Sequence, residues 1–247
     1  EITIFNPQLE SDEYIIQIAC GGNHTMFLTN QGKVWGCGWN EFNQVNSSGD
    51  DPITRPTKIT ETNFVPQLAS NEYIIQIACG SYHTMFLTSE GNVWGCGDNQ
   101  YRQVNSSSYD KIIKPTKITD FPETVEITQI ACGQYHTMFL TSQGKVWGCG
   151  DDYYYQVHST RVQVRGNYIV QKPTELTDFP HLSETGDKII QIACGYEHTT
   201  ITTSKGNVYG CGNNNYNQIS ENYDNTITIN RNTYDVVQNK TLITIPP

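Results

Sequence analysis

The amino-acid sequence predicts an all-β fold, a β-propeller of four-stranded antiparallel blades, from three observations. The chain of 247 residues contains four copies of one segment. Each copy consists of short runs rich in Ile, Val, Thr and aromatic residues, separated by glycine turns, as in β-hairpins. A proline-containing run after each of the first three copies supplies a fourth strand. Because one blade cannot cover both of its faces, the copies must stack around an axis.

The repeated segments have cores at residues 15–38, 74–97, 126–150 and 188–212. Each core holds two cysteines 17 positions apart, whereas successive copies are offset by 59, 53 and 62 residues. The length differences therefore lie between the cores, as expected if they fall in loops. We expect residues 1–247 to form a single propeller domain or a fragment of one.

Three strands are predicted within each core, and the first copy shows the pattern. Residues 15–20 read Ile-Ile-Gln-Ile-Ala-Cys, residues 24–29 read His-Thr-Met-Phe-Leu-Thr and residues 33–37 read Lys-Val-Trp-Gly-Cys. The connection between the second and third strands ends in Gly in every copy, which supplies the positive φ of a tight hairpin. The fourth strand, at the outer edge, is expected at residues 55–59, 114–118 and 172–176.

Three motifs recur in each copy: a Cys-Gly-x-x-His step, a Leu-Thr-x-x-Gly or similar hairpin, and a Trp-Gly-Cys-Gly segment with Tyr for Trp in the last copy. Together they resemble the repeat of the regulator of chromosome condensation family. That resemblance implies a β-propeller that usually has seven blades. The four copies are therefore expected to be part of a longer propeller, with an unusual four-bladed one as the alternative. Residues 1–5 and 233–247 are expected to belong to neighbouring blades.

One departure from the family lies after the third strand, where the family usually has Gly-Gln-Leu-Gly. The glycines are replaced at every copy, in Asn43-Gln44-Val45-Asn46, Arg102-Gln103-Val104-Asn105, Tyr155-Gln156-Val157-His158 and Asn217-Gln218-Ile219-Ser220. Asn tolerates a left-handed backbone, so the turn can survive where Asn stands. Arg102, Tyr155 and His158 fit such a turn less well.

The motifs of an enzyme active site are absent. The sequence has no Gly-x-x-x-x-Gly-Lys phosphate loop and no Gly-x-Ser-x-Gly nucleophile motif. A catalytic residue is rarely needed four times in one chain, so we interpret the repeated histidines as structural, each closing the turn between the first two strands. A ligand or base role is the alternative. These histidines are His24, His83, His136 and His198. We expect no enzymatic activity and no cofactor.

The eight cysteines allow a disulfide, a metal or a free-thiol interpretation. Zinc sites usually use closely spaced cysteine pairs, which this chain lacks. Each cysteine lies in a predicted strand beside Gly or Ala, where a small buried residue suits tight packing. We expect free thiols without metal, and hence a reducing compartment, the cytoplasm or alternatively the nucleus.

Charge and hydropathy exclude two classes of partner. The formal net charge is −10, which disfavours binding to a phosphate backbone, so we expect no nucleic acid. No run of 18 apolar residues occurs, so we expect no membrane-spanning helix.

The candidate binding residues lie in loops. In an up-and-down blade, the loops joining the first to the second strand and the third to the fourth strand share one face, here called the variable face. These loops differ between copies and carry aromatic residues, which are enriched at protein interfaces. The alternative is that the rings only pack the loops down. The candidate partner-binding residues are Tyr82, Tyr101, Tyr135, Tyr153, Tyr154, Arg161, Arg165, Tyr196 and Glu197.

A longer third connection adds residues 161–171, whose alternation around Gly166-Asn167 predicts a protruding β-hairpin on the variable face. The sequence therefore predicts a non-catalytic platform or regulatory propeller that binds a protein. By resemblance, one alternative is a guanine-nucleotide exchange factor for a Ran-like small GTPase. In such exchange factors acidic residues of the Gly-x-x-His loops act on the GTPase, yet Glu197 is the sole acidic residue at these variable positions. A propeller module of a ubiquitin ligase is the other alternative.

Overall fold

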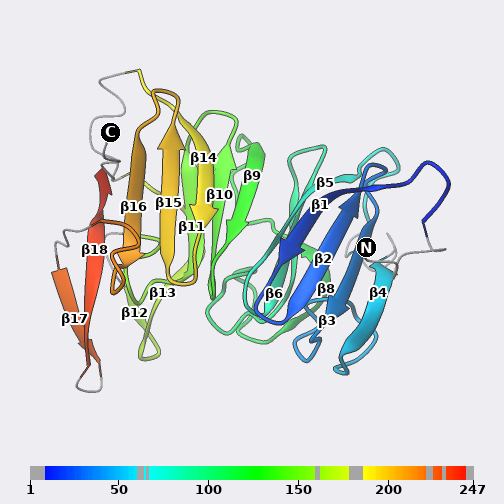
Figure 1. Ribbon diagram of the computed structural model, residues 1–247, viewed down its shortest axis with the longest axis horizontal. Coiled ribbons are helices and arrows are strands. Elements are labelled where there is room, and N and C mark those ends of the chain that lie inside the picture. Colours follow the sequence, from blue (N-terminus) through cyan, green and yellow to red (C-terminus); the bar gives the residue numbers. More distant parts are fainter. Residues whose placement is uncertain are drawn as a thin grey trace.

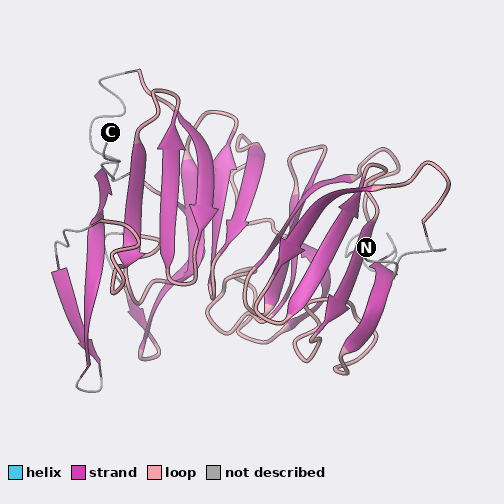
Figure 2. Ribbon diagram, in the orientation of Figure 1, coloured by secondary structure: helices cyan, strands magenta, loops and turns pink. Residues whose placement is uncertain are grey.

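The computed structural model describes residues 9–59, 64, 67–158, 162–177, 186–220, 225–229 and 232–242. Within this part of the chain every regular element is a β-strand (Figure 2). The strands form four antiparallel sheets, each built from one repeat, so the predicted all-β propeller of four blades is confirmed. The first and fourth blades lie at opposite sides of the view, each with its first strand toward the middle of the molecule and its outermost strand at the side (Figure 1).

The first two blades have four strands each, in the order of the sequence. The outer strands contain the predicted prolines, Pro56 and Pro115, next to a register shift against the third strand. A bulge at an edge strand is where the missing N–H of proline does least harm. Blade one comprises β1 (Ile15–Cys20), β2 (His24–Thr29), β3 (Val34–Gly38) and β4 (Ile53–Ile59); blade two comprises β5 (Ile74–Cys79), β6 (His83–Thr88), β7 (Val93–Gly97) and β8 (Ile112–Lys117).

Blades three and four each gain a fifth strand at the outer edge. Blade three comprises β9 (Ile127–Cys132), β10 (His136–Thr141), β11 (Val146–Asp151), β12 (Gln163–Val164) and β13 (Asn167–Glu175), and blade four comprises β14 (Ile189–Cys194), β15 (His198–Thr203), β16 (Val208–Asn213), β17 (Asn225–Ile229) and β18 (Asn232–Leu242).

The expectation that residues 233–247 belong to a neighbouring blade is wrong for the described part of that segment. β18 pairs with β16 and supplies the fourth strand of blade four. This strand has no Lys-Pro-Thr motif, which is why the sequence pattern did not reveal it. Residues 1–5 lie outside the described residues.

The hydrophobic core lies between the blades. One cluster joins Met26 and Leu28 of blade one to Phe86 and Trp94 of blade two, and similar clusters join blades two and three and blades three and four. Phe64, which precedes blade two, packs against Trp94 with ring centroids 5.4 Å apart. The repeated aromatic of the third strand therefore packs blade against blade, as the sequence predicted.

A repeated set of hydrogen bonds connects each blade to the next. Thr84 of blade two donates its hydroxyl proton to the Gln44 carbonyl of blade one at 2.7 Å. Its oxygen lies 2.8 Å from Nε2 of His24, so the imidazole donates to Thr84 as the neutral Nε2–H tautomer. The same pattern recurs with His83, Thr137 and Gln103, and with His136, Thr199 and Gln156.

The histidines were expected to close a turn within their own repeat, and this detail is wrong. The imidazoles of His24, His83 and His136 instead bond a threonine 54 to 63 positions away. The turn is closed by backbone, for example from the Gly21 N–H to the His24 carbonyl at 2.8 Å. A Cβ on Gly21 would come within 2.2 Å of the His24 ring and 2.5 Å of the Gly80 carbonyl, which explains the Cys-Gly-x-x-His step.

A glutamine ladder on the inner strands adds two hydrogen bonds per junction. The Gln17 side chain donates to the Ile77 carbonyl and accepts from the Ile77 N–H, both at 2.9 Å. Gln76 and Gln129 repeat these two bonds with Ile130 and Ile192. The blades are therefore in register along the axis.

The two end blades present unpaired versions of this interface. Ile18 on β1 is 57% exposed, whereas its equivalents Ile77, Ile130 and Ile192 are 1–2% exposed. On blade four, the side chains of Gln191 and His198 make no hydrogen bond to any described residue. The repeated interlock therefore joins three successive pairs of blades and does not recur between blades four and one within the described chain.

Candidate functional site

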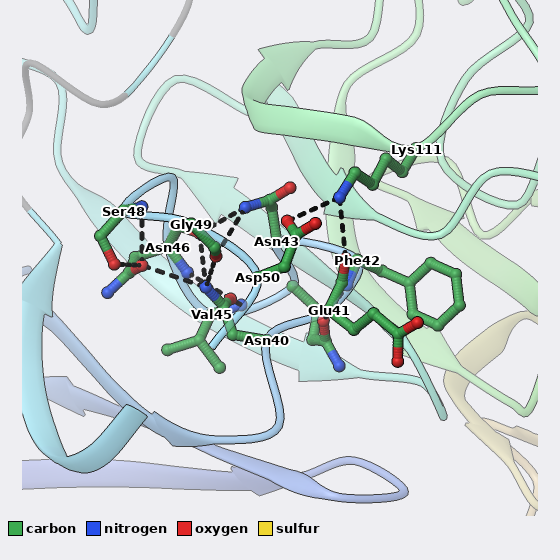
Figure 3. A network of polar contacts seen from close by, with 11 residues as sticks. Asn40, Glu41, Phe42, Asn43, Val45, Asn46, Ser48, Gly49, Asp50 and Lys111 are labelled. Atoms are coloured by element: carbon green, nitrogen blue, oxygen red, sulfur yellow. Dashed lines mark hydrogen bonds and ion pairs between the residues drawn. The ribbon is translucent and has the colours of Figure 1, made fainter. Parts of the chain in front are cut away.

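The loop after each third strand is held by one amide or carboxylate side chain. In blade one, Asn40 Oδ1 accepts from the N–H groups of Val45 and Asn46 at 2.9 and 3.1 Å (Figure 3). Its Nδ2 donates to the Gly49 carbonyl at 2.6 Å. Asn99, Asp152 and Asn214 accept equivalent pairs of bonds in the other blades. These internal bonds fix the loop before any partner arrives.

Neighbouring loops are also tied to each other. Lys111 of blade two donates to the Glu41 carbonyl at 2.8 Å and pairs with the Asp50 carboxylate at 2.7 Å, both in blade one (Figure 3). The variable face is thus a connected surface, in which one loop positions the next.

A glutamine two residues after each loop tip holds the tip in place. Its Oε1 accepts from the backbone N–H of the tip residue, as in the 3.0 Å bond from Tyr101 N to Gln103. The intervening residue has a left-handed φ of 56–64° in all four blades, at Asn43, Arg102, Tyr155 and Asn217. The second replaced glycine, at Asn46, Asn105, His158 and Ser220, does not have positive φ, so His158 is not strained there. The tip residues are Phe42, Tyr101, Tyr154 and Tyr216.

Aromatic rings connect the blades along the variable face. The tip ring of one blade packs against the Gly-x-x-His loop of the next. The centroid distances are 5.3 Å for Phe42–Tyr82 and 4.9 Å for Tyr101–Tyr135. Tyr82 and Tyr135 lie 6.1 Å apart, so the row is continuous over the first three blades. Aromatic pairs at these distances stabilise the loops and leave a rigid, half-buried surface.

The third junction breaks this pattern because Glu197 stands where Tyr82 and Tyr135 stand in the preceding blades. A cleft of about 330 Å³ opens here. Its walls combine four tyrosines with two carboxylates and two amides: Tyr101, Gln134, Tyr135, Asp151, Tyr153, Tyr154, Asn167 and Glu197.

The carboxylates of this cleft are desolvated. Burial raises the pKa of Asp151 to about 7, and the nearby Glu197 adds to the shift. Burial also raises the pKa of Glu197. Gln156 Nε2 donates to Asp151 at 2.8 Å, and Asn213 Nδ2 donates to Glu197 at 2.8 Å. Neither carboxylate forms an ion pair with any described Lys, Arg or His.

The third connection forms the predicted hairpin, β12–β13, with its turn one residue earlier than expected. Val164 pairs with Asn167, so Arg165 and Gly166 are the two central residues, with φ of 53° and 87°. Two positive φ values match a type I′ turn. Tyr168 of the hairpin packs edge-on against Tyr153 at 5.7 Å, and Arg165 lies over the Tyr109 ring at 4.4 Å. The hairpin therefore leans toward blade two.

The structure brings most of the candidate binding residues together. Tyr82 joins the aromatic row that runs to the cleft, whereas Tyr101, Tyr135, Tyr153, Tyr154 and Glu197 line the cleft itself. Tyr196 is separate and lines a channel of about 290 Å³ on the propeller axis. Arg165 stacks on Tyr109 rather than entering the cleft. Arg161 lies outside the described residues. Asp151, which the sequence did not single out, was detectable from its position beside the tip loop.

Burial holds three of the four repeated histidines in the neutral form. Burial lowers the pKa of His24 to about 4 and those of His83 and His136 to about 3. Their Nε2–H groups are occupied by the threonines of the next blade. A neutral, fully enclosed imidazole suits a structural position rather than an acid–base role.

All eight cysteines are free thiols. Four line the axial channel, and burial raises the pKa of two of these, Cys79 and Cys194, to about 12. The described residues contain no group of three or more His, Cys, Asp or Glu side chains arranged to hold a metal ion. They also include no helix that could span a membrane.

Comparison with known proteins agrees with this architecture. The model of the RCC1-like domain matches residues 2–240. This chain belongs to the RCC1-like domain family. The ultraviolet-B receptor UVR8 of Arabidopsis thaliana is 29% identical over 80% of this chain, which spans 41% of the receptor. The human E3 ubiquitin-protein ligase HERC2 is 28% identical over 88% of this chain, which corresponds to 4% of the ligase.

Solved structures show the same fold. Human WBSCR16 aligns with a TM-score of 0.73 at 24% identity, covering 96% of this chain and 55% of that protein. Prp20p of Saccharomyces cerevisiae, whose structure was described with its binding to Gsp1p and histones, aligns with a TM-score of 0.59 at 22% identity. That alignment covers 98% of this chain and 68% of Prp20p. The chain spans about two-fifths of the length of UVR8 and of the human RCC1-like G exchanging factor-like protein.

Proposed function

We propose that this RCC1-like propeller is a non-catalytic platform that binds a protein partner through its variable face. The observation that carries the proposal is the aromatic row of Phe42, Tyr82, Tyr135 and Tyr101, which leads into the cleft beside Glu197. Rigid, half-buried tyrosines give large contact area at low entropic cost and are enriched among binding hot spots. The loops beneath them are already ordered by their own hydrogen bonds.

The turns on the opposite face differ from the variable loops, which supports the variable face as the binding surface. The connections between second and third strands on the opposite face are short glycine turns with nearly the same sequence in every blade. Such turns offer few features by which partners could be distinguished. Among the described residues, the aromatic row, the cleft and the β12–β13 hairpin all lie on the variable face.

Mutation of the two adjacent cleft tyrosines tests the proposal. Tyr153→Ala with Tyr154→Ala should weaken capture of an endogenous partner by at least about thirtyfold, the effect of losing roughly 2 kcal/mol at a hot spot. The matched control is Glu90→Ala with Gln143→Ala, two exposed residues of the opposite turns. Equal loss of binding in both double variants, at unchanged melting temperature, would contradict the proposal.

Guanine-nucleotide exchange on a Ran-like GTPase is the second candidate function. A protruding hairpin beside an acidic Gly-x-x-His loop residue, Glu197, favours it. The curated relatives include the human RCC1-like G exchanging factor-like protein, which is 26% identical over 82% of this chain. An assay of fluorescent GDP release from a Ran-like GTPase distinguishes the platform from the exchange factor. A platform should leave the basal release rate unchanged, whereas faster release would favour exchange.

A place within a larger ubiquitin ligase is compatible with the platform role, because a propeller would then recruit the protein to be modified. The eight free thiols support a reducing compartment such as the cytoplasm. Microscopy of the tagged full-length protein tests the location. A secreted or membrane-enclosed signal would contradict it.

A further inference from the structure

The third blade junction differs from the first two in one residue that changes its chemistry. At the first two junctions a tip ring meets a tyrosine, Tyr82 or Tyr135, and the rings fill the space between blades. At the third, Glu197 occupies that position, and it and the Tyr154 tip both line the cleft. A carboxylate thus replaces an aromatic ring beside an otherwise tyrosine-lined surface.

The cleft walls combine two kinds of group that favour the same ligand. The faces of Tyr101, Tyr135 and Tyr154 carry the negative π density that attracts a cation. Asp151 and Glu197 add carboxylates at the same cleft, and neither is ion-paired with a described basic residue. The amide groups of Gln134 and Asn167 complete the lining without adding charge.

Burial disfavours the ionised form of both carboxylates, and a bound cation would offset that cost. Asp151 is 9% exposed and, like Glu197, is buried enough for its carboxyl pKa to be raised. An entering positive charge stabilises both ionised forms, since an opposite charge within a few ångströms lowers a carboxyl pKa. The surrounding chain, with its net charge of −10, also favours the approach of a basic partner.

We propose that the cleft between blades three and four binds the side chain of an arginine supplied by the protein partner. A planar guanidinium can stack on a tyrosine face while its N–H groups donate to the carboxylates beside it. A lysine ammonium has neither the flat face nor the fork of donors, so it suits these walls less well. This inference rests on the proposed function only in assuming that a protein brings the arginine.

The test is titration of the whole chain with three blocked tripeptides, N-acetyl-Gly-X-Gly-amide, where X is arginine, lysine or the neutral isostere citrulline. Chemical shifts of the cleft residues report binding. The arginine peptide should shift Tyr154 and Glu197 resonances and bind at least several-fold more tightly than the lysine peptide. The citrulline peptide should produce no saturable shift. Citrulline or lysine binding equal to arginine binding would overturn the assignment.

Matched variants test whether the arginine binds at Glu197. Glu197→Gln keeps the shape of the side chain and should weaken arginine binding about tenfold or more, whereas Glu90→Gln on the opposite turn should leave it unchanged. An unchanged affinity in Glu197→Gln would overturn the proposal. A melting temperature equal to that of the unmodified chain shows that either variant is folded.

The two proposals fail in different ways. If a partner is captured on the variable face with undiminished affinity by Glu197→Gln, the platform function stands and the arginine assignment fails. If the arginine peptide binds but no partner contacts the face, the cleft is correctly assigned and the platform function fails.

Discussion

At the residue scale, the structure assigns the repeated His and Thr to one relay between blades. His24 donates to Thr84, which donates back to the Gln44 carbonyl of the first blade. Each relay buries three polar groups that satisfy one another, so removing one member leaves the others unpaired. The relay explains why the same two residue types recur at fixed positions.

Substitution of the relay threonine should destabilise the fold in one blade and not in another. Thr137→Val removes the partner of His83 and of the Gln103 carbonyl, and should lower the free energy of unfolding by about 2–3 kcal/mol. Thr25 holds the same repeat position in blade one, where no described residue bonds its hydroxyl. Thr25→Val should therefore change the free energy of unfolding by less than about 0.5 kcal/mol. Urea denaturation measures both. Equal losses would contradict the relay.

The buried histidines should make stability depend on pH. Their pKa values are about 3 to 4 in the folded chain, against 6.5 when exposed, because of burial. The unfolded chain therefore takes up protons that the native chain does not, and stability present above pH 6.5 is lost as the pH falls toward these folded values. Each histidine contributes up to about 1.4 kcal/mol per pH unit in this window.

Asp151 acts in the opposite direction, because its pKa is raised to about 7 and the native carboxyl binds a proton first as the pH falls. Urea denaturation at pH 7, 6 and 5 should show His83→Asn with a shallower decline than the unmodified chain. The Asp151→Asn variant should show a steeper decline. Parallel pH profiles for all three chains would contradict the protonation states inferred here.

At the element scale, identical strands have different environments. β1 and β5 share the sequence Ile-Ile-Gln-Ile-Ala-Cys, yet Ile18 is 57% exposed and Ile77 is 1% exposed. Ile77→Ala should therefore cost about 2–5 kcal/mol of stability, as other large-to-small core substitutions do. Ile18→Ala should cost less than about 1 kcal/mol. Thermal or urea unfolding compares the pair, and a similar loss in Ile18→Ala would show that β1 is covered in solution.

Most of the strands, but not all, were predictable from the sequence. The strands of the repeat cores, the proline edge strands and the hairpin were predictable, because each rests on a local period or turn signal. β18 was not, since its pairing with β16 carries no local motif. The hairpin turn was misplaced by one residue because Gly166 can occupy either central position of a two-residue turn, and Arg165 takes the other left-handed position.

The sequence could predict which residue types form the candidate site, but not how they are arranged in space. Comparing the copies shows that Glu197 replaces a tyrosine, and the aromatic tips were recognisable by composition. That the tip of one blade meets the Gly-x-x-His loop of the next depends on the stacking of blades 53 to 62 residues apart, which no local pattern encodes. The histidine relay escaped sequence reasoning for the same reason.

At the scale of the whole molecule, three junctions of the same design fix four blades in register and align their variable loops on one face. Within the part of the chain that the structure describes, Ile18 of blade one and Gln191 of blade four have no counterpart across a further junction of this design. The loops are ordered by internal bonds, so their variation changes the surface without disturbing the core. This separation lets the loops vary while the repeat keeps the fold, as the proposed binding platform requires.

Site-specific photo-crosslinking tests whether the protein partner binds the variable face. A benzoylphenylalanine is placed at Tyr101 or Tyr154 on the variable face, or at Glu90 or Gln143 on the opposite turns, and the chain is exposed to its native extract. One partner should be crosslinked from Tyr101 and Tyr154, and an arginine of that partner should lie near Glu197. Crosslinks to that partner formed from Glu90 and Gln143, and not from the tyrosines, would contradict it.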